Sequence, residues 1–422
     1  MSGGPARMKA WVCVLGFWAG LAAAQAPGAR VEELLEIARR QNPELAAMGH
    51  EAEAARERVL PAGALPDPMG RIELRDPGNQ AGNGDFSLLP ARVGSTKYTV
   101  AQTFPLWGKR DLRREMAEAD ATQAQARRAG TWAELAAKVK AAFAQYFLAG
   151  QSLKITQELL RLAGSLEQLT QARYADGLVP QQDVVRAQVE RTALQGELLM
   201  QETGHHHAVA RLNALLRRPP AAPLARAEAL RPLPAPARLD FAALEARLQA
   251  ANPQLAAQEA QIAAAEKNRE LVLKSGYPDL TVGVSPIQTR NRVTEWELMF
   301  EVNIPLQQES RRSQEREAAA MAAAARARKE GAANAFAAEL AENLSALDAA
   351  RRLDQLVATA LLPQADLAFQ AALAGYETGK LDFATLLEAQ RQLRKARLDR
   401  LKAQVEAQMR LAEIERLIGE EL

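Results

Sequence analysis

The sequence contains almost no cysteine: Cys13 is the only one among 422 residues. It lies in the apolar part of a secretory signal peptide at residues 1–24, where Arg7 and Lys9 precede the apolar run and Ala22 to Ala24 offer a small-residue cleavage site. We expect this segment to be removed. The mature chain would then have no disulfide, no thiolate metal site, no cysteine nucleophile and no lipidated cysteine.

Aromatic residues are also scarce, at 5% of the chain, whereas alanine, leucine, glutamate, glutamine and arginine dominate most of its length. This composition is typical of long helices that pack through small side chains. The chain has 53 basic and 51 acidic residues, which indicates no nucleic-acid partner. After the signal, no apolar run reaches about 18 residues, which predicts that no helix spans a membrane and that any membrane segment consists of strands.

Motifs of the common enzyme classes are missing too. The sequence has no His-Glu-x-x-His, no glycine-rich phosphate loop and no Gly-x-Ser-x-Gly. His205, His206 and His207 are consecutive. Neighbouring residues of a helix point about 100° apart, so these three imidazoles cannot converge on one ion. We expect no enzyme activity, no cofactor and no metal site, and the role of the three histidines stays open.

The sequence does contain an internal duplication. Landmarks recur in the same order about 200 residues apart, as expected for two copies of one structural unit. The pairs are Asn42-Pro43 with Asn252-Pro253, Pro66-Asp67 with Pro278-Asp279, Phe104-Pro105-Leu106 with Ile304-Pro305-Leu306, and Tyr174 to Gly177 with Tyr376 to Gly379. We therefore divide the mature chain into a first repeat (25–218), a proline-rich linker (219–238) and a second repeat (239–422).

Each repeat is predicted to contain a helix, a pair of strands and a long helical hairpin. Residues 109–174 contain no proline, and as one helix they would be about 95 Å long at 1.5 Å per residue. In the second repeat, Pro363 interrupts the corresponding rod at 307–376 and predicts a kink or a local break. The return helices are expected at 181–216 and 383–418.

The clearest strand runs from Glu295 to Pro305, where apolar and polar residues alternate. The apolar face consists of Trp296, Leu298, Phe300, Val302 and Ile304, and the acidic residues of the other face are Glu295, Glu297 and Glu301. Segments near 71–75, 96–104 and 280–285 alternate in the same sense. We expect the apolar face to contact lipid and the glutamates to line a barrel interior, while a soluble sheet on a core is the alternative.

Four strands cannot close a membrane barrel alone, because known bacterial barrels begin at about eight strands. In lipid, every backbone donor and acceptor of a strand needs a partner, so other copies must complete the ring. Three copies would supply twelve strands. The strand count thus predicts a homotrimer that contacts outer-membrane lipid.

With these parts assembled, the mature chain resembles the TolC-type outer membrane factors. The marks are the turns Tyr174-Ala-Asp-Gly177-Leu-Val-Pro-Gln-Gln-Asp183 and Tyr376-Glu-Thr-Gly379-Lys-Leu-Asp-Phe, with the duplication and the strand pairs. Gln102-Thr-Phe-Pro-Leu-Trp-Gly-Lys-Arg110 is further similar to the heavy-metal-efflux branch typified by CzcC and CusC channels. The resemblance implies a fold that is mainly α with a small β part: long coiled hairpins and four membrane strands per chain, forming a trimeric twelve-stranded barrel and a twelve-helix periplasmic tunnel.

The resemblance also implies a location and partners. The tunnel would extend from the bacterial outer membrane into the periplasm, and its tips would dock onto a periplasmic adaptor and an inner-membrane pump of the resistance-nodulation-division (RND) class. The two turns would be the tips, where Gly177 and Gly379 allow the positive φ of a tight turn. Leu178, Val179 and Leu381 would contact the adaptor.

Members of this family tend to close the tunnel near the tips with carboxylates and a tyrosine–aspartate contact. The matching positions are Asp183, Tyr376 and Glu388, which we expect to form a cation-favouring gate, with ordinary solvated helix residues as the alternative. The implied function is an exit duct for RND-type efflux, with heavy-metal cations as the suggested substrates. A duct for type I protein secretion or multidrug efflux, and a periplasmic coiled-coil scaffold or adaptor, stay open.

Overall fold

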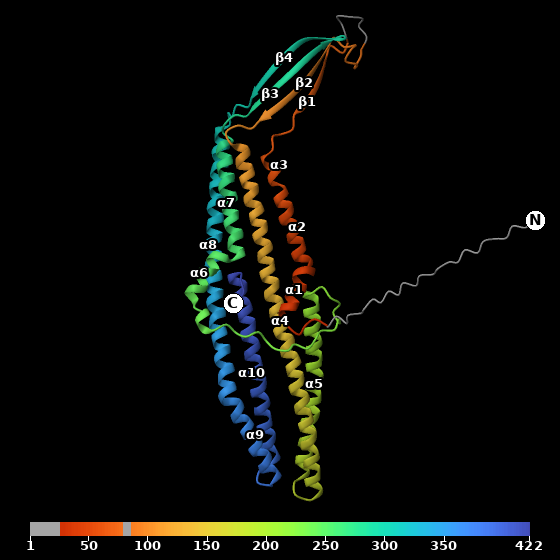
Figure 1. Ribbon diagram of the computed structural model, residues 1–422, viewed down its shortest axis with the longest axis vertical. Helices are drawn as coiled ribbons and strands as arrows, with labels where there is room; N and C mark the ends of the chain where they lie inside the picture. The colour runs from red at the N-terminus through yellow and green to blue at the C-terminus, as the bar shows by residue number, and fades with distance from the viewer. Residues whose placement is uncertain (1–25, 79–85) are drawn as a thin grey trace, which may run out of the picture.

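The computed structural model describes residues 26–78 and 86–422, so the signal peptide predicted at 1–24 lies outside the described residues. The chain is a long, narrow bundle of helices with one small sheet at its upper end (Figure 1). The first half contains α1 (Val31–Gln41), α2 (Pro43–Glu57), α3 (Val59–Gly63), β1 (Met69–Arg75), β2 (Ser95–Phe104), α4 (Lys109–Ala175) and α5 (Gln181–Leu215). The second half contains η1 (Pro236–Arg238), α6 (Phe241–Ala251), α7 (Pro253–Lys274), β3 (Leu280–Thr289), β4 (Arg292–Val302), α8 (Gln308–Leu356), η2 (Val357–Leu361), α9 (Leu362–Glu377) and α10 (Phe383–Ile418). Helices and strands follow in a similar order in both halves, and the exact repeat boundaries stay a prediction.

The longest element is α4, whose 67 residues form one unbroken helix of about 100 Å at 1.5 Å per residue. The prediction of a single rod over 109–174 is therefore confirmed. Helices α2, α5, α7 and α10 all pack against α4. Figure 1 shows α2 above α5 and α7 above α10, so that each pair of shorter helices accompanies the long rods from end to end.

The second rod changes its helical geometry near Pro363. Helix α8 ends at Leu356, a π-helical turn follows at Val357–Leu361, and Pro363 lies in the first turn of α9. A proline ring clashes with the carbonyl four residues earlier, and the wider π turn falls on those residues. The local break that the sequence predicts at this proline is therefore present.

The same helical run, Gln308–Glu377, is long and apolar enough to cross a membrane, contrary to the expectation that no helix would be. That expectation was based on unbroken apolar runs. In this helical run, alanine and leucine raise the mean hydropathy even though isolated polar residues interrupt the apolar ones. Only 22% of the qualifying stretch is buried in the chain. The run has 70 residues, or about 105 Å of helix, so most of it must lie outside a hydrocarbon core of about 30 Å.

The duplicated Asn-Pro motif begins the second helix of each half. Asn42 Oδ1 accepts hydrogen bonds from the backbone N–H groups two and three residues further on, at 2.9 and 3.2 Å. Asn252 Oδ1 accepts the equivalent pair at 2.8 and 2.9 Å. Asparagine satisfies the free N–H groups of a helix start, and proline at the next position has none to satisfy. The repeated dipeptide thus encodes the same capped corner twice.

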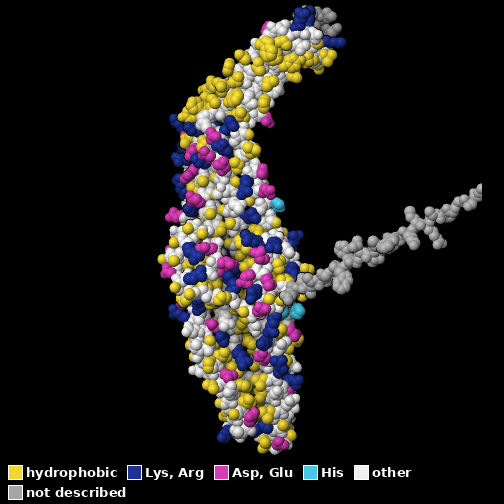
Figure 2. Space-filling view, viewed as in Figure 1, with side chains coloured by type: hydrophobic (Ala, Val, Ile, Leu, Met, Phe, Trp, Pro, Cys, Tyr) yellow, Lys and Arg dark blue, Asp and Glu magenta, His cyan; other side chains and the backbone are white. Residues whose placement is uncertain are grey.

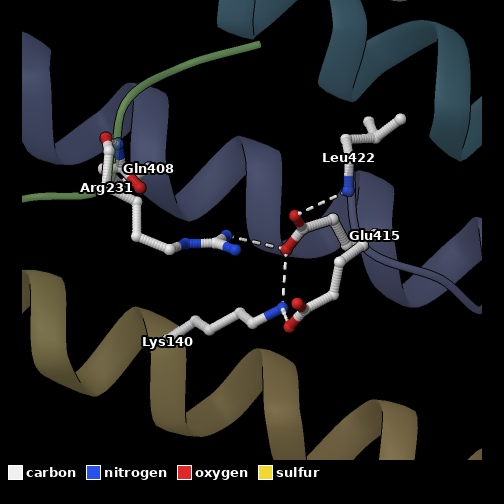
Figure 3. A network of polar contacts seen from close by, with 6 residues as sticks. Lys140, Arg231, Gln408, Glu415 and Leu422 are labelled. Carbon is white, nitrogen blue, oxygen red and sulfur yellow. Dashed lines mark hydrogen bonds and ion pairs between the residues drawn. The ribbon is translucent and has the colours of Figure 1, made fainter. Parts of the chain in front are cut away.

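Midway along the bundle, the linker and the chain's C-terminal end join the two halves through a buried carboxylate (Figure 3). Glu415 Oε2 accepts hydrogen bonds from Lys140 Nζ and Arg231 Nη2, both at 2.8 Å, and its Oε1 accepts one from Leu422 N–H at 3.2 Å. Lys140 Nζ also lies 2.9 Å from Glu421 Oε1. Two cations thus face two carboxylates, which offsets the cost of burying Glu415 and Lys140.

The four strands form one antiparallel sheet in the order β1-β2-β3-β4. Strands β2 and β3 come from different halves and pair directly, with Ala101 opposite Gly283. The strand predicted at 295–305 is observed at Arg292–Val302, so Ile304 lies beyond its end. Strand β4 ends there because Val302 pairs with Leu280, the first residue of β3. The outer edges of β1 and β4 have no strand partner within the described chain.

Candidate functional site

The apolar residues predicted to face lipid lie on an uncovered face of the sheet. Trp296, Leu298 and Phe300 are 70%, 73% and 68% exposed, and Val302 and Ile304 are exposed as well. Figure 2 shows hydrophobic side chains along the visible face of the sheet end. Large apolar side chains that no core of the described chain covers mark a surface meant for another apolar phase or a partner.

The opposite face of the sheet is polar and cross-linked by hydrogen bonds. The hydroxyl oxygens of Thr99 and Ser285 lie 2.8 Å apart, and those of Thr103 and Thr281 lie 2.9 Å apart. Both pairs join β2 to β3, the strands of different halves. The polar side chains therefore satisfy one another across the seam between the two halves.

The glutamates of β4 lie on this polar face. Glu297 forms an ion pair with Lys97 of β2. Glu295 and Glu301 share its face because residues an even number of positions apart in a strand point the same way. The residues of β4 are thus divided between its two faces as the alternation predicts, with acidic groups on one face and bulky apolar groups on the other.

The junction between the sheet and α4 is a polar cluster that sequence reasoning missed. Trp107 and Gly108 have φ values of +64° and +76°, so the chain turns sharply from β2 into α4. The buried Lys109 follows, and its Nζ donates to Tyr277 O at 2.7 Å and to Asp279 Oδ1 at 2.8 Å. The two segments of this cluster, Trp107-Gly108-Lys109 and Pro278-Asp279, both stand out in the sequence. The sequence alone does not show that they lie together.

The lower end of the bundle consists of two turns of the same construction. Gly177 has a φ of +69° and Gly379 a φ of +74°, the positive values that the sequence predicts. Leu178 N–H donates to Arg173 O at 2.8 Å, and Lys380 N–H donates to Gly375 O at 2.8 Å. This bond back across five residues is the Schellman ending of a helix, which a left-handed glycine permits.

The three apolar residues predicted at these turns differ in their exposure. Leu178 is 64% exposed and Leu381 is 40% exposed. Val179 is only half-exposed, because it packs against the buried cluster that includes Phe383 and Tyr376. Val179 therefore offers less free surface than the sequence pattern predicts.

The two carboxylates predicted for the gate lie in different environments. Asp183 is buried in the first turn of α5, and its Oδ1 lies 3.8 Å from Arg186 Nη1. Burial raises the pKa of Asp183, the positive charge of Arg186 lowers it in part, and the negative charge of Asp382 raises it further. Glu388 is exposed and accepts a hydrogen bond from Gln392 Nε2 at 3.1 Å.

Tyr376 is 1% exposed, and its hydroxyl donates to Thr170 Oγ1 of α4 at 3.1 Å. The guanidinium of Arg173 lies 5.0 Å from the centre of the tyrosine ring. Within the described residues of one chain, no hydrogen bond joins Tyr376 to Asp183, so the implied tyrosine–aspartate contact is not made there. Thr170, one helical turn before Arg173 in α4, accepts the hydrogen bond of the tyrosine hydroxyl instead.

The three consecutive histidines lie in different surroundings. The His205 ring lies 5.3 Å from the ring of Tyr146, and burial, with the nearby His206, lowers the pKa of His205. His206 and His207 are exposed. Across 26–78 and 86–422, no group of three or more His, Cys, Asp or Glu side chains is arranged to hold a metal ion.

The chain combines long helical rods, a two-faced sheet at one end and paired glycine turns at the other. The profile of the family "Outer membrane efflux protein" matches residues 34–216 and 244–420. The chain belongs to this family, and the resemblance to outer membrane factors that the sequence indicates is confirmed. The protein is an outer-membrane efflux channel.

Individual relatives cover nearly the whole chain. The cobalt-zinc-cadmium resistance protein CzcC of Cupriavidus metallidurans is 27% identical over 403 residues, which are 92% of this chain and 90% of CzcC. The structure of the channel OprN matches with a TM-score of 0.76 at 21% identity, over 92% of this chain and 89% of OprN. VceC of Vibrio cholerae matches with 0.78 at 16% identity (93% and 96%), and CusC with 0.73 at 18% identity (92% of each). The solved structures thus share the fold.

Proposed function

We propose that three copies of this chain form the exit duct of a tripartite efflux system of the RND class. The observation that carries the proposal is a sheet with one exposed apolar face, one polar face and two edges that no strand of the described residues pairs with. Unpaired strand edges are not tolerated in lipid, and a four-stranded sheet cannot close on itself. Three copies would join edge to edge into a twelve-stranded barrel, without performing chemistry.

The helices support the same assembly. Exposed apolar side chains lie along two parts of the bundle: Leu353, Leu356 and Leu367 on α8 and α9, and Val189, Leu199 and Met200 on α5. Apolar surface of this extent favours association. Neighbouring copies would cover it and complete a periplasmic tunnel of twelve helices.

The lower turns would face a periplasmic adaptor, which in turn would join the duct to an inner-membrane pump. Leu178 and Leu381 are exposed apolar groups there, and Val179 would contribute part of its surface. Gly177 and Gly379 would hold the turns in shape. Replacing both leucines with aspartate should prevent cross-linking to the adaptor while the trimer persists, and unaffected cross-linking would contradict this docking site.

The gate proposal assigns Asp183 and Glu388 to a cation-favouring constriction near the tips, with Tyr376 holding α9 against α4. The test is single-channel recording of Asp183→Asn combined with Glu388→Gln. We expect lower cation selectivity, and unchanged selectivity and conductance would refute the gate. Glu295, Glu297 and Glu301 would add acidic charge in the barrel, but Arg71, Arg75 and Lys97 offset it, so we expect only weak selectivity there.

Heavy-metal cations are the proposed substrates, because CzcC, a cobalt-zinc-cadmium resistance protein, aligns along nearly the whole chain. Membrane fractionation with an unboiled gel tests the duct itself: we expect a trimer in the outer membrane, and a soluble monomer would overturn the proposal. Removing the gene should then raise sensitivity to Co²⁺, Zn²⁺ and Cd²⁺.

A duct for type I protein secretion or multidrug efflux would have the same fold. If loss of the gene changed only drug sensitivity or protein secretion, the metal assignment would fail while the duct remained. The periplasmic scaffold or adaptor considered from the sequence is not favoured, since a water-soluble scaffold would leave the face of Trp296, Leu298 and Phe300 in water.

A further inference from the structure

The two open edges of the sheet carry complementary charges on the same face. The residues of β1 on this face are Met69, Arg71, Glu73 and Arg75, and those of β4 are Glu295, Glu297, Met299 and Glu301. Arginine therefore alternates with one glutamate at the first edge. Glutamate predominates at the other edge, with one neutral methionine among the acids.

The strand register shows that these groups share a face. Arg71 pairs with Thr99, the Thr99 hydroxyl contacts that of Ser285, and Ser285 pairs with Glu297. One straight row therefore runs across the sheet from Arg71 to Glu297. The two edges would meet in a ring of copies, each presenting these charges to the barrel interior.

We propose, on the basis of the trimeric duct proposed above, that β4 of one copy pairs antiparallel with β1 of the next in a charge-defined register. In this register Arg71 lies opposite Glu301 and Arg75 lies opposite Glu297. Glu73, the only acid of β1 on this face, lies opposite the neutral Met299. Glu297 would then form ion pairs with Lys97 of its own chain and with Arg75 of the next copy.

The neighbouring registers are disfavoured by like charges. Sliding β1 by two residues in either direction places Glu73 opposite Glu297 or opposite Glu301, and like charges directly opposite each other destabilise a strand pair. Sliding by one residue turns the polar face of one strand toward the apolar face of the other. Among these registers, only the proposed one pairs both arginines with acids and leaves Glu73 beside a neutral group.

The apolar face agrees with this register. It places Ile72 opposite Phe300 and Leu74 opposite Leu298. Ile72, Phe300 and Leu298 are all exposed in the single chain. Aromatic residues opposite β-branched residues are among the favourable cross-strand pairs, so the seam would present a continuous apolar surface to lipid.

The register also gives a reasonable barrel. A straight row leads from Arg71 to Glu297, so pairing Arg71 with Glu301 introduces a stagger of four residues per copy. Four residues are about 14 Å along a strand, and four strands are about 19 Å across, which corresponds to a strand tilt of about 35°. Membrane barrels have tilts of about 35–45°.

Disulfide trapping tests the register, since Cys13 is the only natural cysteine and belongs to the predicted signal. The test chain carries Arg71→Cys with Glu301→Cys. The matched controls carry Arg71→Cys with Met299→Cys, two residues away on the same face of β4, or with Asn303→Cys, the first residue after the end of β4. A bond within one chain is excluded, because β1 and β4 lie at opposite edges of the four-stranded sheet. Outer-membrane fractions are oxidised and run on denaturing gels with and without reductant.

We expect reducible covalent dimers and trimers in severalfold higher yield for the pair 71 and 301 than for either control. A higher yield from a control pair would overturn the register while the seam and the trimer remained. Trimers on unboiled gels without any cross-link would overturn the β1–β4 seam. A monomer on unboiled gels of the unmodified chain would instead refute the proposed duct.

Charge exchange provides a second, independent readout. Arg71→Glu and Glu301→Arg should each lower the temperature at which the trimer dissociates on a gel by several degrees, and the double exchange should restore most of the loss. Arg75→Glu with Glu301→Arg is the matched double variant and should not restore it. Equal recovery in both double variants would show that only net charge matters, which contradicts the paired register.

Discussion

The helical bundle and the sheet differ in how far one chain completes them. In the bundle, two buried polar groups show such completion: Glu415 accepts hydrogen bonds from two cations, and the Tyr376 hydroxyl donates to Thr170. In the sheet, the bulky side chains of β4 are exposed, and two strand edges have no partner among residues 26–78 and 86–422. One copy thus supplies a buried core to the bundle, although apolar side chains of α5, α8 and α9 stay exposed, whereas the sheet is a fragment of a larger structure. Substitutions in the two regions should therefore fail in different ways.

The largest effect is expected at Phe383, which is fully buried with its ring 5.4 Å from that of Tyr376. Phe383→Ala should lower the free energy of unfolding by about 3–5 kcal/mol, because it removes buried apolar surface and leaves a cavity. Denaturant unfolding followed by circular dichroism measures this. Leu178→Ala, at an exposed position on the same end of the bundle, is the control, and an equal loss there would contradict the idea of a core within one chain.

Phe300→Arg should disturb assembly in the membrane and leave the bundle intact. An arginine on the lipid face of a barrel costs about 2–4 kcal/mol at the bilayer midplane. We expect less trimer in the outer-membrane fraction, with unchanged helical content. Met299→Arg places the same charge on the polar face and should be tolerated. If both variants reduced the amount of trimer equally, the assignment of the lipid-facing and polar faces of β4 would be wrong.

A smaller effect is expected at the lower turns. Gly379 has a φ of +74°, and Gly379→Ala should cost about 1–2 kcal/mol because a side chain is strained in this region. Gly331 lies inside α8, and a Cβ there meets nothing within 4 Å. Gly331→Ala should instead stabilise the helix by about 0.5–1 kcal/mol. Thermal unfolding of both variants decides whether the turn requires glycine.

The smallest effect concerns the pH dependence of stability at Asp183. Burial, its main cause, raises the pKa of this carboxyl in the folded chain. Its contribution to stability is therefore full below the pKa of the unfolded chain and is lost as pH rises through the raised folded-state pKa. Asp183→Asn should lose less stability than the natural chain between acidic and neutral pH, as measured by thermal unfolding at both. An unchanged pH dependence of stability in this variant would contradict a raised pKa of Asp183.

Much of the local structure could be predicted from sequence, because it depends on neighbouring residues. The rod at 109–174, the break at Pro363 and the glycine turns follow from proline, glycine and helix propensity. The end of β4 was less predictable, since it depends on where β3 begins. The exposed helical run 308–377 was missed as a membrane-length apolar segment, because its apolar residues are interspersed with polar ones.

The candidate site divides in the same way. Alternation alone separated Trp296, Leu298 and Phe300 from the glutamates of β4. The partners of Tyr376 and Lys109 could not be found, because Thr170, Tyr277 and Asp279 are more than 160 residues away along the chain. The spacing of residues along the sequence gives no information about contacts between such distant segments.

The sequence by itself determined the duplicated helices and strands, their two-faced patterns and the turns at the lower end, since each depends on the spacing of residues along a short segment. Only the tertiary structure decided that β2 pairs with β3 and that β1 and β4 are left as the open edges. It also decided that a buried glutamate joins the linker to both halves. These features depend on hydrogen bonds and ion pairs between distant segments, which form only when the chain brings the two halves side by side.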